Sequence, residues 1–253
     1  MSLCFECTQC GKCCHGLRLT LAVDEAITWA ENGHVVQILT EALPAPLAEA
    51  SADSQAEYDI ARSFPAMSGA MPIRIAAVLV AFHEGACPYL QSDMRCGNYA
   101  DRPRICRIYP LESRPFSRMS PERRLCPPEA WTSDRPLLLN GDRIADTNLM
   151  DIVADHRRTL IDDVPVVAAA CAALGIASAA FSNEGLAAHH PVGSVLAAAL
   201  RQAKIDCDDN QELKHWTIVT NREVTRSMLA EAGCTTSLTS QGEGYLGSFP
   251  DEV

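Results

Sequence analysis

The sequence has few aromatic residues and no long apolar run. Phe, Trp and Tyr together make up 6% of the 253 residues. The longest apolar stretches, such as residues 73–82, are too short to span a bilayer, and this one is interrupted by Arg74. The first residues, Met1 to Cys4, lack the basic start and the apolar segment of a secretory signal peptide. We therefore expect a cytoplasmic protein with no membrane association.

Several catalytic and cofactor-binding motifs are also absent. We find no internal repeat, no glycine-rich nucleotide-binding loop and no G-x-S-x-G nucleophile motif. The C-x3-C-x2-C signature of radical S-adenosylmethionine enzymes fails as well. Cys10 and Cys14 have its first spacing, but the third required position is Leu17. These absences argue against a serine hydrolase and against a radical enzyme.

Basic residues are outnumbered overall but are concentrated in one segment. The formal net charge is −11, so nucleic-acid binding is not expected. Residues 95–124 nevertheless contain eight Arg and only three acidic residues. This basic segment lies among cysteines. It predicts contact with negative charge, either at a bound metal centre or on a protein partner or protein substrate.

Cysteine, in contrast, is abundant. Nine of the 12 cysteines lie in the first half, and five of these fall between Cys4 and Cys14. In a reducing cytoplasm, clustered thiols are typical of metal ligands or redox groups rather than of structural disulfides. Disulfides between such close neighbours would also be strained. The scattered Cys171, Cys207 and Cys234 are interpreted as ordinary thiols.

The adjacent pair Cys13 and Cys14 indicates more than one metal position. Side chains of consecutive residues point in different directions, so we do not expect both to bind the same single ion. They would serve two separate sites, or different metal atoms of one cluster. Two four-thiolate sites would use eight cysteines: Cys7, Cys10, Cys13, Cys14, Cys87, Cys96, Cys106 and Cys126. Cys4 is then a ninth ligand, a spare thiol or a replacement for Cys126.

This ligand set suits either zinc or an iron–sulfur cluster. Structural zinc sites usually contain two separated C-x2-C pairs, and only the first segment here has that spacing. The run C-x2-C-x2-C and the Cys-Pro pairs at Cys87 and Cys126 are typical of bacterial ferredoxins, although no C-x3-C-P follows directly. All the expected ligands are soft sulfur atoms. We favour one or two iron–sulfur clusters of the 4Fe–4S kind, with zinc as the alternative.

Arginines next to Cys106 are candidates for supporting the metal centre from outside. Arg102, Arg104 and Arg107 could hydrogen-bond to sulfur and offset the negative charge of a thiolate-bound metal. The other arginines of interest are expected either in solvent or at an anionic ligand or partner: Arg114, Arg118, Arg123 and Arg124. His15 and His83 lie near the cysteines, and we expect them beside the ligands or in solvent rather than on the metal.

The pattern predicts an α+β fold that is mostly helical, with few short strands. Strands are expected at 17–21, 73–82 and 215–220, and helices at 25–33, 34–42, 148–160, 165–174, 195–204 and 223–232. Abundant Pro, Gly, Asn and Arg at 87–128 indicate a loop-rich, metal-organised amino half. We expect a cysteine-cluster metal-binding domain at 1–130 and a helical, acidic region at 131–253, with a mobile tail from 235 to 253.

Together these residues resemble the cysteine-cluster family named for its CxxCxxCC motif, which is described as a zinc- or iron-chelating domain. The resemblance rests on three segments, residues 5–14, 85–90 and 96–110. It covers roughly residues 5–130 and leaves the second half unexplained. The resemblance implies metal chelation by Cys7, Cys10, Cys13, Cys14, Cys87, Cys96 and Cys106.

The same segment is similar to that of the flagellin lysine N-methylases. Those enzymes are associated with an iron–sulfur cluster and with S-adenosylmethionine-dependent methyl transfer, but the carboxyl half of this chain matches nothing of theirs. Three functions stay open. The protein is an iron–sulfur protein with a redox or protein-modification role, an S-adenosylmethionine-dependent protein lysine methyltransferase, or a zinc-stabilised binding or accessory module without enzymatic activity.

Overall fold

The chain forms two compact units, and each is built from two separate stretches of sequence. The computed structural model describes residues 2–45, 54–115, 117, 119–206 and 213–251. Unit 1 comprises Met1–Leu21 and Ala81–Thr159, and unit 2 comprises Ala22–Val80 and Leu160–Val253. The domain division expected at residues 130 and 131 stays a prediction. None of the helices within the described ranges is both long and apolar enough to cross a membrane.

The largest element of the structure is a mixed sheet of nine strands. Its strand order is β11-β10-β8-β3-β5-β2, and β4, β9 and β12 join this path through further pairings. The strands that pair in parallel are β3 (Val36–Pro44), β8 (Ser178–Phe181), β10 (Thr217–Thr220) and β11 (Thr236–Leu238). The other strands are β2 (Arg18–Thr20), β4 (Phe64–Ser68), β5 (Met71–Phe82), β9 (Gly185–His189) and β12 (Tyr245–Gly247).

The prediction of a mostly helical α+β fold is therefore wrong. Helix accounts for 34% and strand for 27% of the structure, and the fold is α/β. Residues 34–42 were expected to be helical, but β3 occupies residues 36–44. The first five residues of β3 are all buried, and an uninterrupted buried run lacks the period that separates a strand from a helix. Strands β8 and β9 contain several Ala residues, whose helix propensity hides a short strand.

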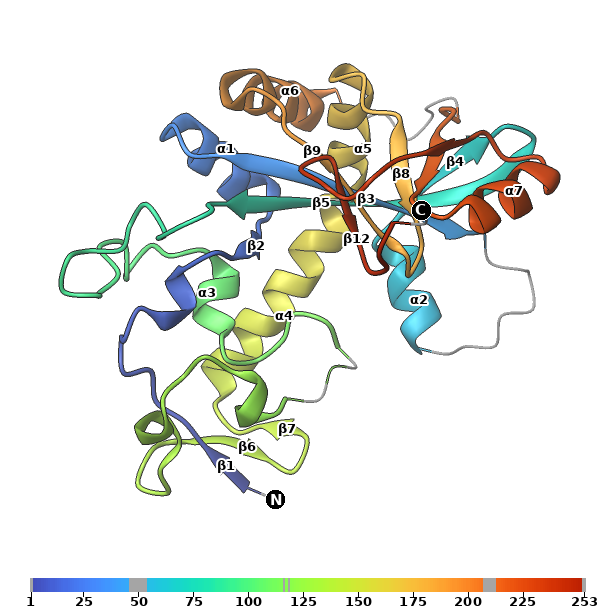
Figure 1. Cartoon of the computed structure of the whole chain (residues 1–253). Helices are drawn as coiled ribbons and strands as arrows, with labels where there is room; N and C mark the ends of the chain where they lie inside the picture. The colour runs from blue at the N-terminus through green and yellow to red at the C-terminus, as the bar shows by residue number, and fades with distance from the viewer. Residues whose placement is uncertain (1, 46–53, 116, 118, 207–212, 252–253) are drawn as a thin grey trace. The chain divides into compact units, whose positions relative to one another are not determined.

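Helices cover the sheet of unit 2 and supply an apolar core. They are α1 (Val23–Glu31), α2 (Ser54–Ala61), α5 (Val164–Ala173), α6 (Gly193–Ile205) and α7 (Glu223–Glu231). Helices α1, α5 and α6 pack together along one side of the sheet (Figure 1). Leu196 and Leu200 of α6 are completely buried, and Trp29 of α1 is almost so. Unit 2 thus has a core that needs no metal.

Unit 1 contains much less regular structure. Its small sheet consists of β1 (Ser2–Cys4), β6 (Leu137–Asn140) and β7 (Arg143–Ile144). Its helices are α3 (Arg104–Ile108), α4 (Thr147–Asp162) and the 3-10 turns η1 (Lys12–Cys14), η2 (Pro121–Arg123) and η3 (Pro128–Trp131). Residues 83–103 contain only turns, bends and isolated bridges. The buried part of its core is small: Ile108, Leu111, Leu138 and Val153.

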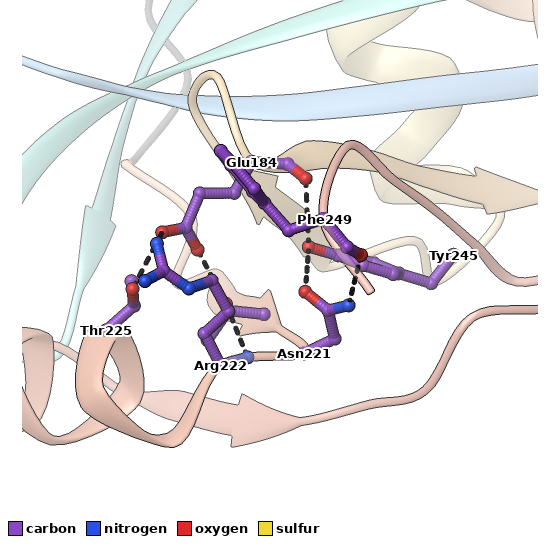
Figure 2. A network of polar contacts seen from close by, with 7 residues as sticks. Glu184, Asn221, Arg222, Thr225, Tyr245 and Phe249 are labelled. Carbon is purple, nitrogen blue, oxygen red and sulfur yellow. Dashed lines mark hydrogen bonds and ion pairs between the residues drawn. The ribbon is translucent and has the colours of Figure 1, made fainter. Parts of the chain in front are cut away.

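A buried carboxylate links the sheet of unit 2 to the start of α7. Glu184 lies in the turn between β8 and β9, and its side chain is almost completely enclosed. The hydroxyls of Thr220 and Thr225 each donate a hydrogen bond to its carboxylate at 2.7 Å, and Arg222 Nη1 donates at 3.1 Å. Figure 2 shows the Arg222 guanidinium and Thr225 meeting this carboxylate from the α7 side. All three of these groups donate hydrogen bonds to the carboxylate, as a buried anion requires.

The same network holds the carboxyl-terminal segment. Asn221 Nδ2 donates to the carbonyl of Phe249 at 2.9 Å and to Asp251 Oδ1 at 3.0 Å (Figure 2 draws the first contact). The Arg222 guanidinium lies 5.1 Å from the Phe249 ring centroid. Strand β12 pairs with β9 in the same segment. The mobility expected for residues 235–253 stays a prediction. Any such motion of the described part would have to break these contacts.

We predict that Glu184→Gln destabilises unit 2 by about 1–3 kcal/mol. The amide of Gln must direct its N–H₂ group toward one of the hydroxyl or guanidinium donors, and that donor then has no acceptor. Denaturant unfolding of the two proteins measures this difference. Glu223→Gln is the matched control, since Glu223 also pairs with an arginine, Arg226, but at the surface. That change should cost no more than about 1 kcal/mol. Equal losses in the two variants would contradict the structural role of the Glu184 network.

The half-buried His189 should make the stability of the protein depend on pH. His189 Nε2 lies 3.0 Å from the Ser178 carbonyl and 2.9 Å from Thr40 Oγ1, and burial lowers the pKa of His189. The unfolded chain therefore binds the proton more readily, and the free energy of unfolding falls as pH drops below about 6.5. Denaturation at pH values on both sides of this value should show a smaller pH dependence in His189→Gln. The exposed His215→Gln is the control; an unchanged pH dependence in His189→Gln would contradict the prediction.

Candidate metal centre

The end of the CxxCxxCC motif is joined to the second cysteine loop by backbone hydrogen bonds. The Cys87 N–H donates to the Cys14 carbonyl at 2.7 Å, and the Gly16 N–H donates to the Gly85 carbonyl at 2.9 Å. Between them, His15 and Ala86 form an antiparallel bridge. These contacts bring Cys87 next to Cys14, although 72 residues separate them in the sequence.

Gly11 allows the two loops to approach closely. Its φ is +68°, a conformation that favours glycine, and a Cβ at this position would lie 2.5 Å from the Met94 carbonyl oxygen. The second loop is itself closed by the Gly97 N–H, which donates to the Tyr89 carbonyl at 2.7 Å. A bridge between Leu90 and Cys96 completes this turn. Cys87 and Cys96 are therefore both presented by a compact loop that packs on the motif.

Cys106 reaches the same place from the short helix α3. The Cys106 N–H donates to the Pro103 carbonyl at 2.9 Å, which fixes the first turn of the helix. Ile108 of this helix is completely buried in the core of unit 1. Burial is the main cause that raises the pKa of Cys106 to about 12, and the neighbouring thiols of Cys13, Cys87 and Cys96 add to it.

Four thiols are linked by electrostatic effects of Cys87 and Cys96, and we call them the inner thiol group: Cys14, Cys87, Cys96 and Cys106. The pKa of Cys14 is raised first by its hydrogen bond with Cys13, then by burial and by the charges of Cys13, Cys87 and Cys96. Burial raises the pKa of Cys87, and Cys96 and Cys13 raise it further. The pKa of Cys13 is lowered to about 7, mainly because Cys14 donates that hydrogen bond to its sulfur. Such repulsion operates only over short distances, so these sulfur atoms are neighbours.

Cys126 belongs to a different set, the outer thiol group, which consists of Cys7, Cys10, Cys13 and Cys126. Its pKa is raised to about 11, first by burial and then by Cys13, Cys10 and Cys7, while a hydrogen bond with Tyr109 lowers it. The start of the motif lies near η3, because the Glu6 N–H donates to the Ala130 carbonyl at 3.0 Å. Phe5 and Trp131 also stack with ring centroids 4.6 Å apart. Cys7 is exposed, unlike the other members of both groups.

The remaining cysteines lie elsewhere. Cys4 pairs with Leu137 in the small sheet of unit 1. Cys171 is buried in α5 of unit 2, and Cys234 lies between α7 and β11. Cys207 lies outside the described residues. Each of the eight expected ligands is therefore found in unit 1 with other expected ligands around it.

The thiols are gathered without forming a closed ligand set. Among the described residues, no three Cys, His, Asp or Glu side chains converge tightly enough to hold a metal ion as they stand. The chemistry of the donors nevertheless fits a soft cation, since zinc and iron both accept four thiolates. Ionising several of these thiols together is unfavourable without positive charge, as the raised pKa values of Cys87, Cys106 and Cys126 indicate.

The three arginines expected to support the centre have different surroundings. The Arg102 guanidinium lies 3.7 Å from the Tyr99 ring centroid and lowers the pKa of both Cys13 and Cys106, so it lies near the thiols. Arg104 Nε pairs with Asp155 Oδ2 at 3.3 Å. Arg107 is exposed. Arg102 is therefore the one whose charge acts on the thiols.

The other basic and histidine candidates are spread around these loops. Arg124 pairs with Glu112 at 2.7 Å, and Arg114 and Arg123 are exposed. Arg118 lies outside the described residues. His15 Nδ1 lies 3.2 Å from the Gly11 carbonyl, and His83 Nδ1 lies 3.1 Å from the Gly85 carbonyl.

Tyr109 is a residue of the site whose role the sequence did not reveal. It follows Cys106 by three residues, and the sequence favours simple packing against the cysteine loop. In the structure its phenol contacts the Cys126 side chain and the Leu125 backbone. No spacing in the sequence signalled this contact, because Cys126 lies 17 residues after Tyr109.

A comparison with known families bears directly on these loops. The family model CxxCxxCC, described as "Putative zinc- or iron-chelating domain", matches residues 6–127. Searches of curated proteins and of solved structures returned no match. The matched segment contains every member of the inner and outer thiol groups. Residues 6–127 therefore match the CxxCxxCC family model, and the cysteines of this segment form a metal-binding cluster of the zinc- or iron-chelating kind that the model describes.

Proposed function

We propose that unit 1 holds two metal centres, each with four thiolates, and that both are iron–sulfur clusters. The inner thiol group would supply Cys14, Cys87, Cys96 and Cys106, and the outer thiol group would supply Cys7, Cys10, Cys13 and Cys126. The observation that carries this proposal is that different thiols raise the pKa of Cys126 and of Cys106, apart from Cys13, which acts on both. Cys126 responds to Cys7 and Cys10, whereas Cys106 responds to Cys87 and Cys96.

Cys13 influences thiols of both groups, which suits a residue at their junction. Assigning it to the outer group gives four ligands to each site and separates it from Cys14. Side chains of adjacent residues diverge, so a division at this peptide bond is the natural one. Arg102 would then offset charge at the junction, since it lowers the pKa of Cys13 and of Cys106.

The two sites differ in their exposure to solvent. The side chain of Cys106 is largely enclosed, and the buried Ile108 anchors its helix α3 in the core of unit 1. Cys7 of the outer thiol group is exposed. Bound iron–sulfur clusters supply reversible one-electron chemistry. We therefore assign a structural role to the inner site and a redox role to the outer site, which a protein partner in the cytoplasm can approach from the side of Cys7.

We expect anaerobically purified protein to contain iron and acid-labile sulfide, and to show visible absorption that dithionite bleaches. Elemental analysis and spectroscopy of the full chain check this. A colourless protein with two zinc ions would keep the four-thiolate sites and replace the redox role by a structural one. Protein without iron or zinc, and with all thiols free in a titration, would contradict metal binding itself.

The division into two sites predicts that single substitutions remove one centre each. Cys106→Ser should lose the inner centre and Cys126→Ser the outer one, so that each variant retains about half of the wild-type metal. Cys171→Ser, which changes a buried thiol of unit 2, is the control and should keep all of it. Metal analysis of the purified variants measures the outcome. Complete loss of metal in both Cys106→Ser and Cys126→Ser would show that the thiols form one interdependent centre.

A further inference from the structure

The phenol of Tyr109 lies next to Cys126, which is the last cysteine of the outer thiol group in the sequence. The Leu125 N–H donates a hydrogen bond to Tyr109 Oη at 3.0 Å. The side chains of Tyr109 and Cys126 are also hydrogen-bonded to each other. Tyr109 therefore contacts two consecutive residues, one through its backbone and the next through its sulfur.

The direction of these hydrogen bonds follows from the groups involved. A backbone N–H can only donate, so the phenol oxygen is the acceptor toward Leu125. The phenol O–H then remains available as a donor, and the Cys126 sulfur is the partner that the contacts provide. A phenol keeps its proton at neutral pH, so this donor is present.

Other contacts fix the tyrosine and the cysteine from outside. The Arg124 guanidinium lies 5.8 Å from the Tyr109 ring centroid and pairs with Glu112 at 2.7 Å. On the far side of Cys126, Trp131 Nε1 lies 3.5 Å from the Cys126 carbonyl oxygen. The backbone of Cys126 and its side chain are thus held by two different aromatic residues.

We propose that Tyr109 is a positioning residue for the outer metal centre: its phenol O–H donates to Cys126 Sγ and holds that sulfur toward Cys7 and Cys10. The inference rests on the proposed function, since it assigns a role at the outer site. Once the sulfur is ionised, the same hydrogen bond becomes charge-assisted and strengthens. Hydrogen bonds from such supporting residues commonly change metal affinity by about 10–100-fold.

The experiment compares Tyr109→Phe with wild type and with Tyr99→Phe, by titrating the reduced, metal-free full-length protein with Co²⁺ in competition with a chelator. Phe keeps the ring under Arg124 and removes only the hydroxyl. We expect wild type to fill two sites. In Tyr109→Phe the Cys126 site should bind Co²⁺ about 10–100-fold more weakly, with a shifted sulfur-to-cobalt charge-transfer band. In Tyr99→Phe, the ring under Arg102 is kept, and we expect the Co²⁺ affinity and the charge-transfer band to stay unchanged.

A double-variant comparison separates positioning from a general effect on folding. In the Cys126→Ser background the sulfur is absent, so Tyr109→Phe should cause no further loss of Co²⁺ binding. An equal loss in both backgrounds would overturn the proposal, because the tyrosine would then act through the fold alone. Two unchanged sites in Tyr109→Phe would overturn it as well. Wild type that binds no Co²⁺ and yields no iron or zinc on purification would instead overturn the proposed function, and this inference with it.

Discussion

The rest of unit 1 depends on the cost of placing many thiols side by side. Burial opposes the ionisation of each thiol, and each ionised sulfur adds to that cost for its neighbours, which together raise the pKa values of Cys87, Cys106 and Cys126. Backbone hydrogen bonds between Cys14 and Cys87, and the tight packing at Gly11, nevertheless bring the loops together. Such an assembly is favourable when a bound cation offsets the charge. Chelation of zinc or iron is the property by which the CxxCxxCC family is described.

The two units are stabilised by different means. Unit 2 has a large sheet, packed helices and an apolar core, and even its buried carboxylate Glu184 is satisfied by protein donors. Unit 1 has a small core, and residues 83–103 contain no helix or extended strand. Loops without an apolar core lose conformational entropy on folding and gain little in return. In the proposed arrangement, metal–thiolate bonds supply the stabilisation that the small apolar core of unit 1 does not.

The sequence predicted the chemistry of unit 1 better than the fold of unit 2. Cysteine spacing indicated the metal-binding loops directly, because closely spaced thiols suit a soft metal whatever fold surrounds them. Strand β3 was missed because its buried run has no period, and β8 and β9 because Ala favours helices in isolation. Their strand conformation comes from pairing with segments far along the chain, such as Thr40 of β3 with Ala187 of β9. Tyr109 illustrates the same limit, since its contact with Cys126 spans 17 residues and arises only from the loop fold.

The hydrogen bond between Cys13 and Cys14 has a consequence for two centres that meet at one peptide bond. The hydrogen bond from Cys14 is the largest cause that favours ionisation of Cys13, and it requires that Cys14 keeps its proton, so ionising both thiols together is unfavourable. A cation bound by the inner thiol group would replace that proton and at the same time attract the charge on Cys13. Binding at either site would therefore reduce the electrostatic cost of filling the other. Arg102, which favours the ionised forms of Cys13 and Cys106, would act on both sites at this junction. In the proposed arrangement, the adjacency of Cys13 and Cys14 would thus also couple the two sites electrostatically.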